Sequence, residues 1–105
     1  MKIGTIRPTA KVKLKVRDQI VNGESEGAGP VDASANAIMI ALGEQFRLAK
    51  YELNAISGGT DSLCQVLTVI EDMKGNTSIG SAIGPDIVKT SVDAMIEAIN
   101  QLYRE

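Results

Sequence analysis

Three glycine-rich corners carry the residue types best suited to holding an anion. They read "EGAGPVD" at 26–32, "SGGTDS" at 57–62 and "AIGPDI" at 82–87. Two of them stand where a helix is expected to begin, and a helix start offers free backbone N–H groups and the positive end of the helix dipole. A corner of this kind can equally be a plain turn or cap, so the type of anion has to come from other residues.

The residues around these corners favour a carboxylate over a phosphate. The P-loop pattern GxxxxGK[ST] is absent, and the glycine spacing does not match the dinucleotide-binding fingerprint. Asp32, Asp61 and Asp86 lie at or beside the corners. Acidic residues at helix starts usually serve as caps, but one of them could instead receive an ammonium group. A ligand with both a carboxylate and an ammonium group is an amino acid.

Composition argues against several classes of function. The chain has no histidine and a single cysteine, Cys64, which removes the commonest general base, makes a zinc site improbable and prevents an intramolecular disulfide. Nucleophilic catalysis would need Cys64 or a serine activated without imidazole. The net charge of −2 argues against nucleic-acid binding. We find neither a membrane-length apolar run nor a signal peptide, and expect a cytoplasmic protein without a cofactor.

The elements that must position the corners follow from hydrophobic periodicity. "AKVKLKVRD" alternates between apolar residues and a row of lysines, which is typical of a half-buried strand with a solvated face; phosphate contact is the alternative for that row. "LCQVLTVIE" is apolar on both faces and predicts a central strand. The full expectation is strands at 10–18, 20–27, 47–57, 63–71 and 77–82, with helices at 30–46 and from 85 or 86 to 103.

Each predicted helix has an apolar stripe at helical spacing. Pro30 suits the first helical position, because its missing N–H would be unpaired there anyway. Gly80 suggests a bulge in the last strand. The stripe of the first helix comprises Val31, Ala35, Ile38, Leu42 and Phe46. That of the second comprises Ile87, Ser91, Val92, Met95, Ala98, Ile99 and Leu102.

The two halves of the sequence share one plan of strand, turn, glycine-bearing strand and helix. Gly29-Pro30 and Gly84-Pro85 stand near the two helix starts. Ala37 and Ala41 recur as Ala94 and Ala98. We therefore predict an α+β fold with two layers, an internally pseudo-symmetric duplication of a β-β-(β)-α unit with two main helices. Residues 1–9 would form an arm or linker, and 10–105 a single domain with halves of about 10–46 and 47–105.

The corner motifs carry a family resemblance over roughly residues 10 to 102. "GAGPVDAS.NAI", "YELNAISGGTDS..QV" and "GPDIVKTSVDAMIEAIN" occur in the order and spacing of the C-terminal regulatory domain of the 2-isopropylmalate synthase and citramalate synthase family, which the chain resembles. The sequence has Ala28 where the family commonly has Asn, Ser62 where it commonly has Ala, and Gly84-Pro85 before Asp86.

The resemblance implies two β-β-β-α-like units related by pseudo-symmetry, a homodimer, and leucine or isoleucine bound near the dimer interface. Binding would inhibit a catalytic barrel that condenses acetyl-CoA with a 2-oxo acid. By position, the first corner would form one wall of the effector site and the last corner another, the 47–57 strand would contribute further residues, and Ser62 would lie next to the pocket. These residues are Gly27, Ala28, Gly29, Pro30, Val31, Asp32, Tyr51, Asn54, Ala55, Ser62, Pro85, Asp86 and Ile87.

The catalytic barrel itself does not fit in this sequence, because a (β/α)₈ barrel takes about 250 residues. The chain is therefore expected to be non-catalytic, either an excised or a free-standing regulatory domain that acts on a barrel in cis or in trans. Two alternatives remain open. One is a dimerisation or interaction module without an effector, and the other is a small enzyme of unknown type.

Overall fold

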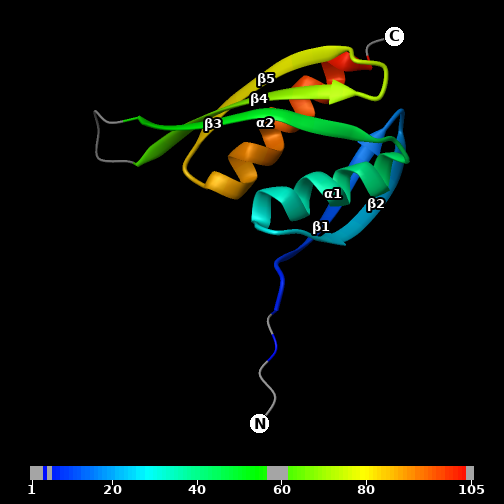
Figure 1. The fold of residues 1–105 in the computed structure, drawn as a ribbon, viewed down its shortest axis with the longest axis horizontal. Helices are drawn as coiled ribbons and strands as arrows, with labels where there is room; N and C mark the ends of the chain where they lie inside the picture. The colour runs from blue at the N-terminus through cyan, green and yellow to red at the C-terminus, as the bar shows by residue number, and fades with distance from the viewer. Residues whose placement is uncertain (1–3, 5, 57–61, 104–105) are drawn as a thin grey trace. The chain divides into compact units, whose positions relative to one another are not determined.

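The computed structural model describes residues 4, 6–56 and 62–103, and the chain divides into two compact units. Unit 1 spans Met1–Glu44 and unit 2 spans Gln45–Glu105. Their elements are labelled in Figure 1. In chain order they are β1 (Thr9–Val16), β2 (Gln19–Glu26), α1 (Pro30–Leu42), β3 (Phe46–Ile56), β4 (Leu63–Asp72), β5 (Thr77–Gly84) and α2 (Ile87–Leu102).

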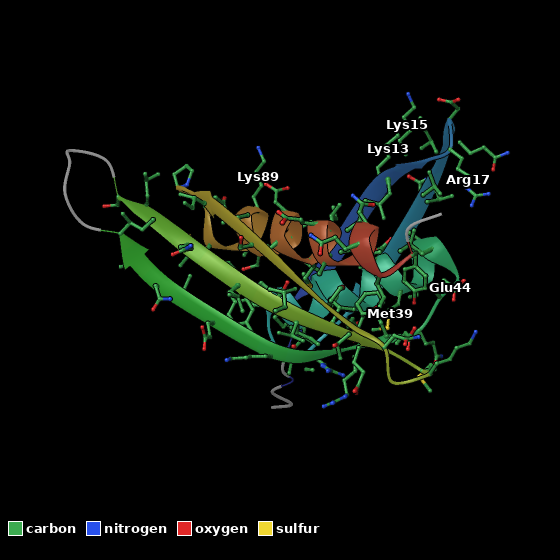
Figure 2. The ribbon with its side chains drawn as sticks, turned by 90° about the horizontal axis from the view of Figure 1, so that it is seen from above. Lys13, Lys15, Arg17, Met39, Glu44 and Lys89 are labelled. Atoms are coloured by element: carbon green, nitrogen blue, oxygen red, sulfur yellow. The ribbon has the colours of Figure 1, made fainter. Side chains whose placement is uncertain are left out.

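Unit 1 is an antiparallel β1–β2 hairpin with α1 packed on it. Its turn, Arg17-Asp18, has positive φ at both residues (49° and 65°), as a two-residue hairpin turn of type I′ requires. The predicted alternation is confirmed, because Val12 and Leu14 are half-buried while the lysines of β1 are exposed. Lys13 and Lys15 extend from this hairpin beside its turn (Figure 2).

Helix α1 begins at Pro30 as predicted but ends four residues earlier than expected. Gly43 takes a left-handed conformation (φ 68°), and its N–H donates to the Met39 carbonyl at 2.9 Å. A glycine in this conformation is a common helix terminator. The placement of Phe46 in the helix stripe was therefore wrong: Phe46 is the first residue of β3, where it is buried.

Unit 2 is an antiparallel sheet in the order β3-β4-β5 with α2 on one face. The prediction of a central strand is confirmed, since β4 is paired on both sides and Val66, Thr68 and Ile70 are fully buried. The predicted bulge at Gly80 was wrong. Gly80 pairs in regular register with Thr68, and the irregularity lies between Leu48 and Lys50.

Helix α2 begins one or two residues later than predicted, because Asp86 is its N-cap and not a helical residue. Ser91, Met95, Ala98 and Ile99 of the expected stripe are buried. Ile87 is not part of that buried stripe, since it lies in the first turn and its side chain is 49% exposed.

The two units repeat the same contact between a strand glycine and a helix. A Cβ at Gly23 would collide with the backbone oxygen of Ala37 in α1, and a Cβ at Gly80 would collide with that of Ala94 in α2. Both pairs are related by the same shift of 57 positions (80 minus 23, 94 minus 37). Only glycine allows the helix to approach the strand so closely, and this explains Gly80 better than a bulge does.

The same shift corrects the predicted pairing of the two Gly-Pro sequences. Gly27 corresponds to Gly84 (84 minus 27 is 57), and each lies against the first turn of its helix, at Ala33 and Thr90. The N-cap Gly29 then corresponds to the N-cap Asp86. Gly29-Pro30 therefore begins a helix, whereas Gly84-Pro85 ends a strand and precedes the cap.

Candidate functional site

The corner between β2 and α1 is fixed from both sides. Gly27 is buried, its N–H donates to the Pro8 carbonyl at 3.1 Å, and a Cβ on it would collide with the backbone nitrogen of Ala33. The Asn36 side chain donates to the Glu26 carbonyl at 3.0 Å and so ties the end of β2 to the helix. Gly27 has a packing role here, and it places the residues that follow it at the start of α1.

The start of α1 has no side-chain cap. Its N-cap Gly29 is extended (φ −146°, ψ 175°), and Pro30 occupies the first helical position. The first intrahelical bond runs from the Ala33 N–H to the Gly29 carbonyl at 2.9 Å. The amides of Val31 and Asp32 come before it and therefore have no acceptor within the helix. Together with the helix dipole, two such amides can bind a carboxylate.

The start of α2 is capped by its own sequence. The Asp86 carboxylate accepts the Lys89 N–H at 2.9 Å. An aspartate in this geometry satisfies one helix-start donor and places a negative charge at the positive end of the dipole. Asp86 therefore acts as a cap in this structure, and Pro85 and Ile87 are exposed on either side of it. A second carboxylate at this helix start would be repelled by the charge of the first.

Tyr51 is linked to the first turn of α2 by a pair of hydroxyl groups. Its hydroxyl lies 2.7 Å from that of Ser91, which is fully buried. Ser91 in turn donates to the Ile87 carbonyl at 2.7 Å. Ser91 was expected only as a member of the apolar stripe, and its bond to Tyr51 was not predicted. A serine four residues after the first helical position signals the bond within the helix, as at Ser34 in α1, where the hydroxyl donates to the Pro30 carbonyl, but it does not signal the bond to Tyr51.

The remaining predicted residues of unit 2 do not all lie on one face. Ala55 is four residues after Tyr51 in β3 and lies on the same, helix-facing side of the sheet. Asn54 pairs with Gln65 and lies on the opposite side. Ser62 is exposed immediately before β4, and the rest of the "SGGTDS" corner, 57–61, lies outside the described residues.

In unit 1 all six predicted residues, 27–32, form one continuous corner, from which Ala28, Pro30 and Asp32 are exposed.

Two surface hollows of unit 1 lie elsewhere, and none of the predicted residues lines either of them. One is lined by Val16, Arg17, Gln19, Val21, Ala41 and Leu42. The other is lined by Lys11, Val12, Asn22, Gly23, Glu24 and Ile40.

A shifted pKa is found away from these corners, at Asp72. Desolvation raises the pKa of the Asp72 carboxyl, but hydrogen bonds from the Asn76 side chain and from the backbone N–H groups of Asn76 and Lys74 lower it by more. The net pKa is below its ordinary value. Asp72 closes the β4–β5 turn, so the shift reflects the structure of this turn and not a reactive site.

The described residues offer no obvious metal site or membrane helix. Within 4, 6–56 and 62–103, His, Cys, Asp and Glu do not gather in any group of three that could hold a metal ion. Neither of the two helices in that part of the chain is long and apolar enough to cross a membrane. The chemistry at the described corners is therefore that of backbone amides, a few hydroxyl groups and exposed carboxylates.

The chain is similar to known proteins over nearly its whole length. Residues 1–103 match the family model of the LeuA allosteric (dimerisation) domain. The chain is 43% identical over 95 residues to a 2-isopropylmalate synthase of Methanocaldococcus jannaschii, covering 90% of this chain and 18% of that protein. It is 41% identical over 102 residues to a putative (R)-citramalate synthase of Archaeoglobus fulgidus, covering 93% of this chain and 20% of that protein.

A further relative shows the same partial coverage. A probable 2-isopropylmalate synthase of Methanosarcina acetivorans is 39% identical over 102 residues, covering 95% of this chain and 20% of that protein. The chain thus spans about a fifth of the length of the curated relatives it matches. With nearly all of its residues matched by the family model, the chain belongs to the family of LeuA allosteric (dimerisation) domains.

Proposed function

We propose that this chain is a homodimeric regulatory domain that binds a branched-chain amino acid, leucine or isoleucine. Binding would inhibit an acetyl-CoA-dependent 2-isopropylmalate or citramalate synthase whose catalytic barrel is supplied in cis or in trans. The names of the relatives support the choice of a 2-isopropylmalate or citramalate synthase as the regulated enzyme. The observation that carries effector binding is the uncapped start of α1, in a chain that belongs to an allosteric domain family.

The proposed chemistry assigns different roles to the two helix starts. The amides of Val31 and Asp32 would hold the ligand carboxylate, because no side chain of this corner satisfies them. Asp32 is exposed in the first turn and could accept the ammonium group. Asp86 is less suited to that role, since it already accepts the Lys89 N–H. Val31, in the first turn of α1, would contact the branched side chain of the ligand.

Selectivity between effectors would then depend on shape. One methylene in an apolar pocket is worth only about 1–3 kcal/mol, so valine, which is one methylene smaller, should bind roughly 10- to 200-fold more weakly at most. Leucine and isoleucine are isomers, and only the shape of the site can distinguish them. The second candidate function is a dimerisation module that binds no effector. Ala28 and Ser62, at positions where the family commonly has Asn and Ala, are the residues that favour it.

Titration calorimetry with leucine, isoleucine and valine tests the proposal on the wild-type chain. Binding of one of them, with about 2.7 kcal/mol of added stability at 100 times its Kd, is the expected result. Absence of both heat and a melting shift with all three would favour the module without an effector.

The variant Gly29→Val tests where the carboxylate binds. Gly29 has an extended backbone and open space around its Cβ position, so valine should leave the fold nearly unchanged while it screens the α1 amides. We expect the Kd to rise at least about tenfold, which is about 1.4 kcal/mol. Gly4→Val, also in open space, is the matched control. Equal affinity in the two variants would show that this corner is only a helix start.

A further inference from the structure

Unit 2 has one sheet face that its own helix does not cover. Val66, Thr68 and Gly80 are buried on the side where α2 packs, and because side chains alternate along a strand, their neighbours lie on the opposite side. We call that side the outer face. The strand registers place six apolar residues on it, namely Ile56, Leu63, Leu67, Val69, Ile79 and Ile83.

The apolar residues of the outer face are substantially exposed. Ile79 and Ile83 of β5 are 57% and 60% exposed, and Ile56 and Leu63 are each 37% exposed. Leu67 and Val69 lie between these positions on the central strand and are half-buried. Single exposed apolar residues are ordinary, but a contiguous patch with polar surroundings is typical of a surface that another molecule covers.

The charges beside this patch neutralise each other. Arg47 lies 2.8 Å from Glu71, and Lys50 lies 3.1 Å from Glu52, all on the outer face. The other polar residues of the face are uncharged; they are Asn54, Gln65, Thr77 and Ser81. The apolar residues of the face thus lie mainly on β4 and β5 with uncharged polar residues among them, and its charged residues, on β3 and at Glu71, add no net charge. An identical face could approach it without like-charge repulsion.

The duplicated unit shows that the β-β-α fold does not itself require this apolar face. In unit 1 the shift of 57 places Asn22 at the position of Ile79 and Glu26 at that of Ile83 (79 minus 22, 83 minus 26). The neighbouring strand β1 presents lysines on that side. The same architecture is thus compatible with a charged outer face, so the apolar residues of unit 2 need a different explanation.

We propose that the outer face of unit 2 is the surface through which two copies of this chain associate, sheet against sheet. The occupant is a second copy because the face has no net charge and is compatible with itself, and because the family is described as a dimerisation domain. The inference rests on the homodimer of the proposed function, but it does not require an amino-acid effector.

The chain offers a closely matched pair of double variants. Ile79→Glu with Ile83→Glu places two charges on the outer face, at side chains that are 57% and 60% exposed. Ile20→Glu with Ile40→Glu places the same two charges on unit 1, at side chains that are 59% and 58% exposed. Sedimentation equilibrium without any amino acid should give a dimer for the wild type and for the unit 1 variant. The outer-face variant should have a dimer dissociation constant at least about 100-fold higher.

The outcomes separate this inference from the proposed function. A monomeric wild type would overturn both the homodimer and the outer-face interface. A dimeric wild type with equal weakening in both variants, or with none in the outer-face variant, would overturn only the interface. If circular dichroism shows that the glutamates unfold unit 2, Ile79→Thr with Ile83→Thr, which keeps β-branched residues, replaces them under the same criteria. Calorimetry on the wild type tests effector binding independently.

Discussion

The two helix starts of this chain occupy corresponding positions in duplicated units, yet their amides are satisfied differently. At α2, the Asp86 carboxylate accepts the Lys89 N–H at 2.9 Å. At α1, the corresponding residue is Gly29, which has no side chain to do so. The glycine contacts that pack each helix on its strand are alike in both units. The shared packing therefore preserves the architecture, while a single position decides whether a helix start carries its own carboxylate cap.

The units differ also in their strands. In unit 2, β3 pairs with β4, and its Tyr51 hydroxyl reaches Ser91 of α2. In the part of unit 1 that the structure describes, only β2 pairs with β1, and the corresponding Ser34 donates to its own helix at Pro30. The two duplicated units of the chain thus present different surfaces, which can take up separate roles in effector binding and in self-association.

The largest expected effect tests whether the two glycine contacts are equivalent. Gly23→Val and Gly80→Val should each lower the free energy of unfolding by about 3 kcal/mol or more, because the new side chain meets helix backbone that cannot move aside. Urea unfolding of both variants measures this. Gly29→Ala, in open space, is the control. A near-neutral effect at either Gly23 or Gly80 would contradict the duplicated packing.

Changing the two caps should reverse the difference between the helix starts. Asp86→Ala should lower the stability of the chain by about 1 kcal/mol, since it removes the acceptor of the Lys89 N–H. Gly29→Asp should raise stability by a few tenths of a kcal/mol and weaken the binding of an amino-acid carboxylate. Thermal unfolding measures the changes in stability, and calorimetry measures the affinity for the amino acid. Tighter amino-acid binding by Gly29→Asp would mean that the carboxylate lies elsewhere.

The Tyr51–Ser91 bond gives a smaller test of the third strand. Tyr51→Phe removes one hydroxyl and should cost about 0.5–1.5 kcal/mol of stability. Ser91→Ala and the double variant complete a double-mutant cycle, which isolates the energy of the pair from the other contacts of Ser91. A coupling energy of zero in that cycle would show that the bond does not hold β3 to α2.

The smallest effect concerns acid stability at the β4–β5 turn. The folded-state pKa of Asp72 is below its ordinary value because Asn76 and Lys74 donate to the carboxylate. Its stabilising contribution is therefore present above the unfolded pKa of about 3.9 and is lost as the pH falls towards the lower folded value. Asp72→Asn should reduce the loss of stability between about pH 5 and pH 2, measured by urea unfolding. If the stability of the variant falls by the same amount over this pH range, Asp72 does not contribute to the acid sensitivity of the chain.

Much of the fold could be predicted because the periodic patterns are local. Alternation placed Val12 and Leu14 towards the helix, and the continuous apolar run at 63–71 identified the central strand. The helix end at Gly43 was missed because the apolar spacing continues to Phe46, and only the left-handed conformation of the glycine shows where the helix terminates. Gly80 was misread because the sequence does not show how close a helix comes to a strand.

The candidate site could be predicted only in part. The corner at 27–32 is continuous in sequence, so its residues could be grouped from their order along the chain alone. Tyr51 was expected to contribute, but its bond to Ser91 joins residues 40 positions apart and depends on how α2 crosses the sheet. The opposite placement of Asn54 follows from strand register, which a set of motif positions does not contain.

The sequence by itself determined the family, the order of strands and helices, and the three glycine corners, because these depend on local spacing and residue type. The sequence offers two offsets between its halves, 55 from the Gly-Pro pairs (84 minus 29) and 57 from the alanines (94 minus 37). The tertiary structure decided for 57, so that Gly27 corresponds to Gly84 and Gly29 to Asp86. The reason is that equivalence between the units is set by where helix backbone contacts a strand. The similar text Gly29-Pro30 and Gly84-Pro85 is offset from that contact by two residues, so the choice between the two offsets, and with it the pairing of the capped with the uncapped helix start, needed the three-dimensional contact.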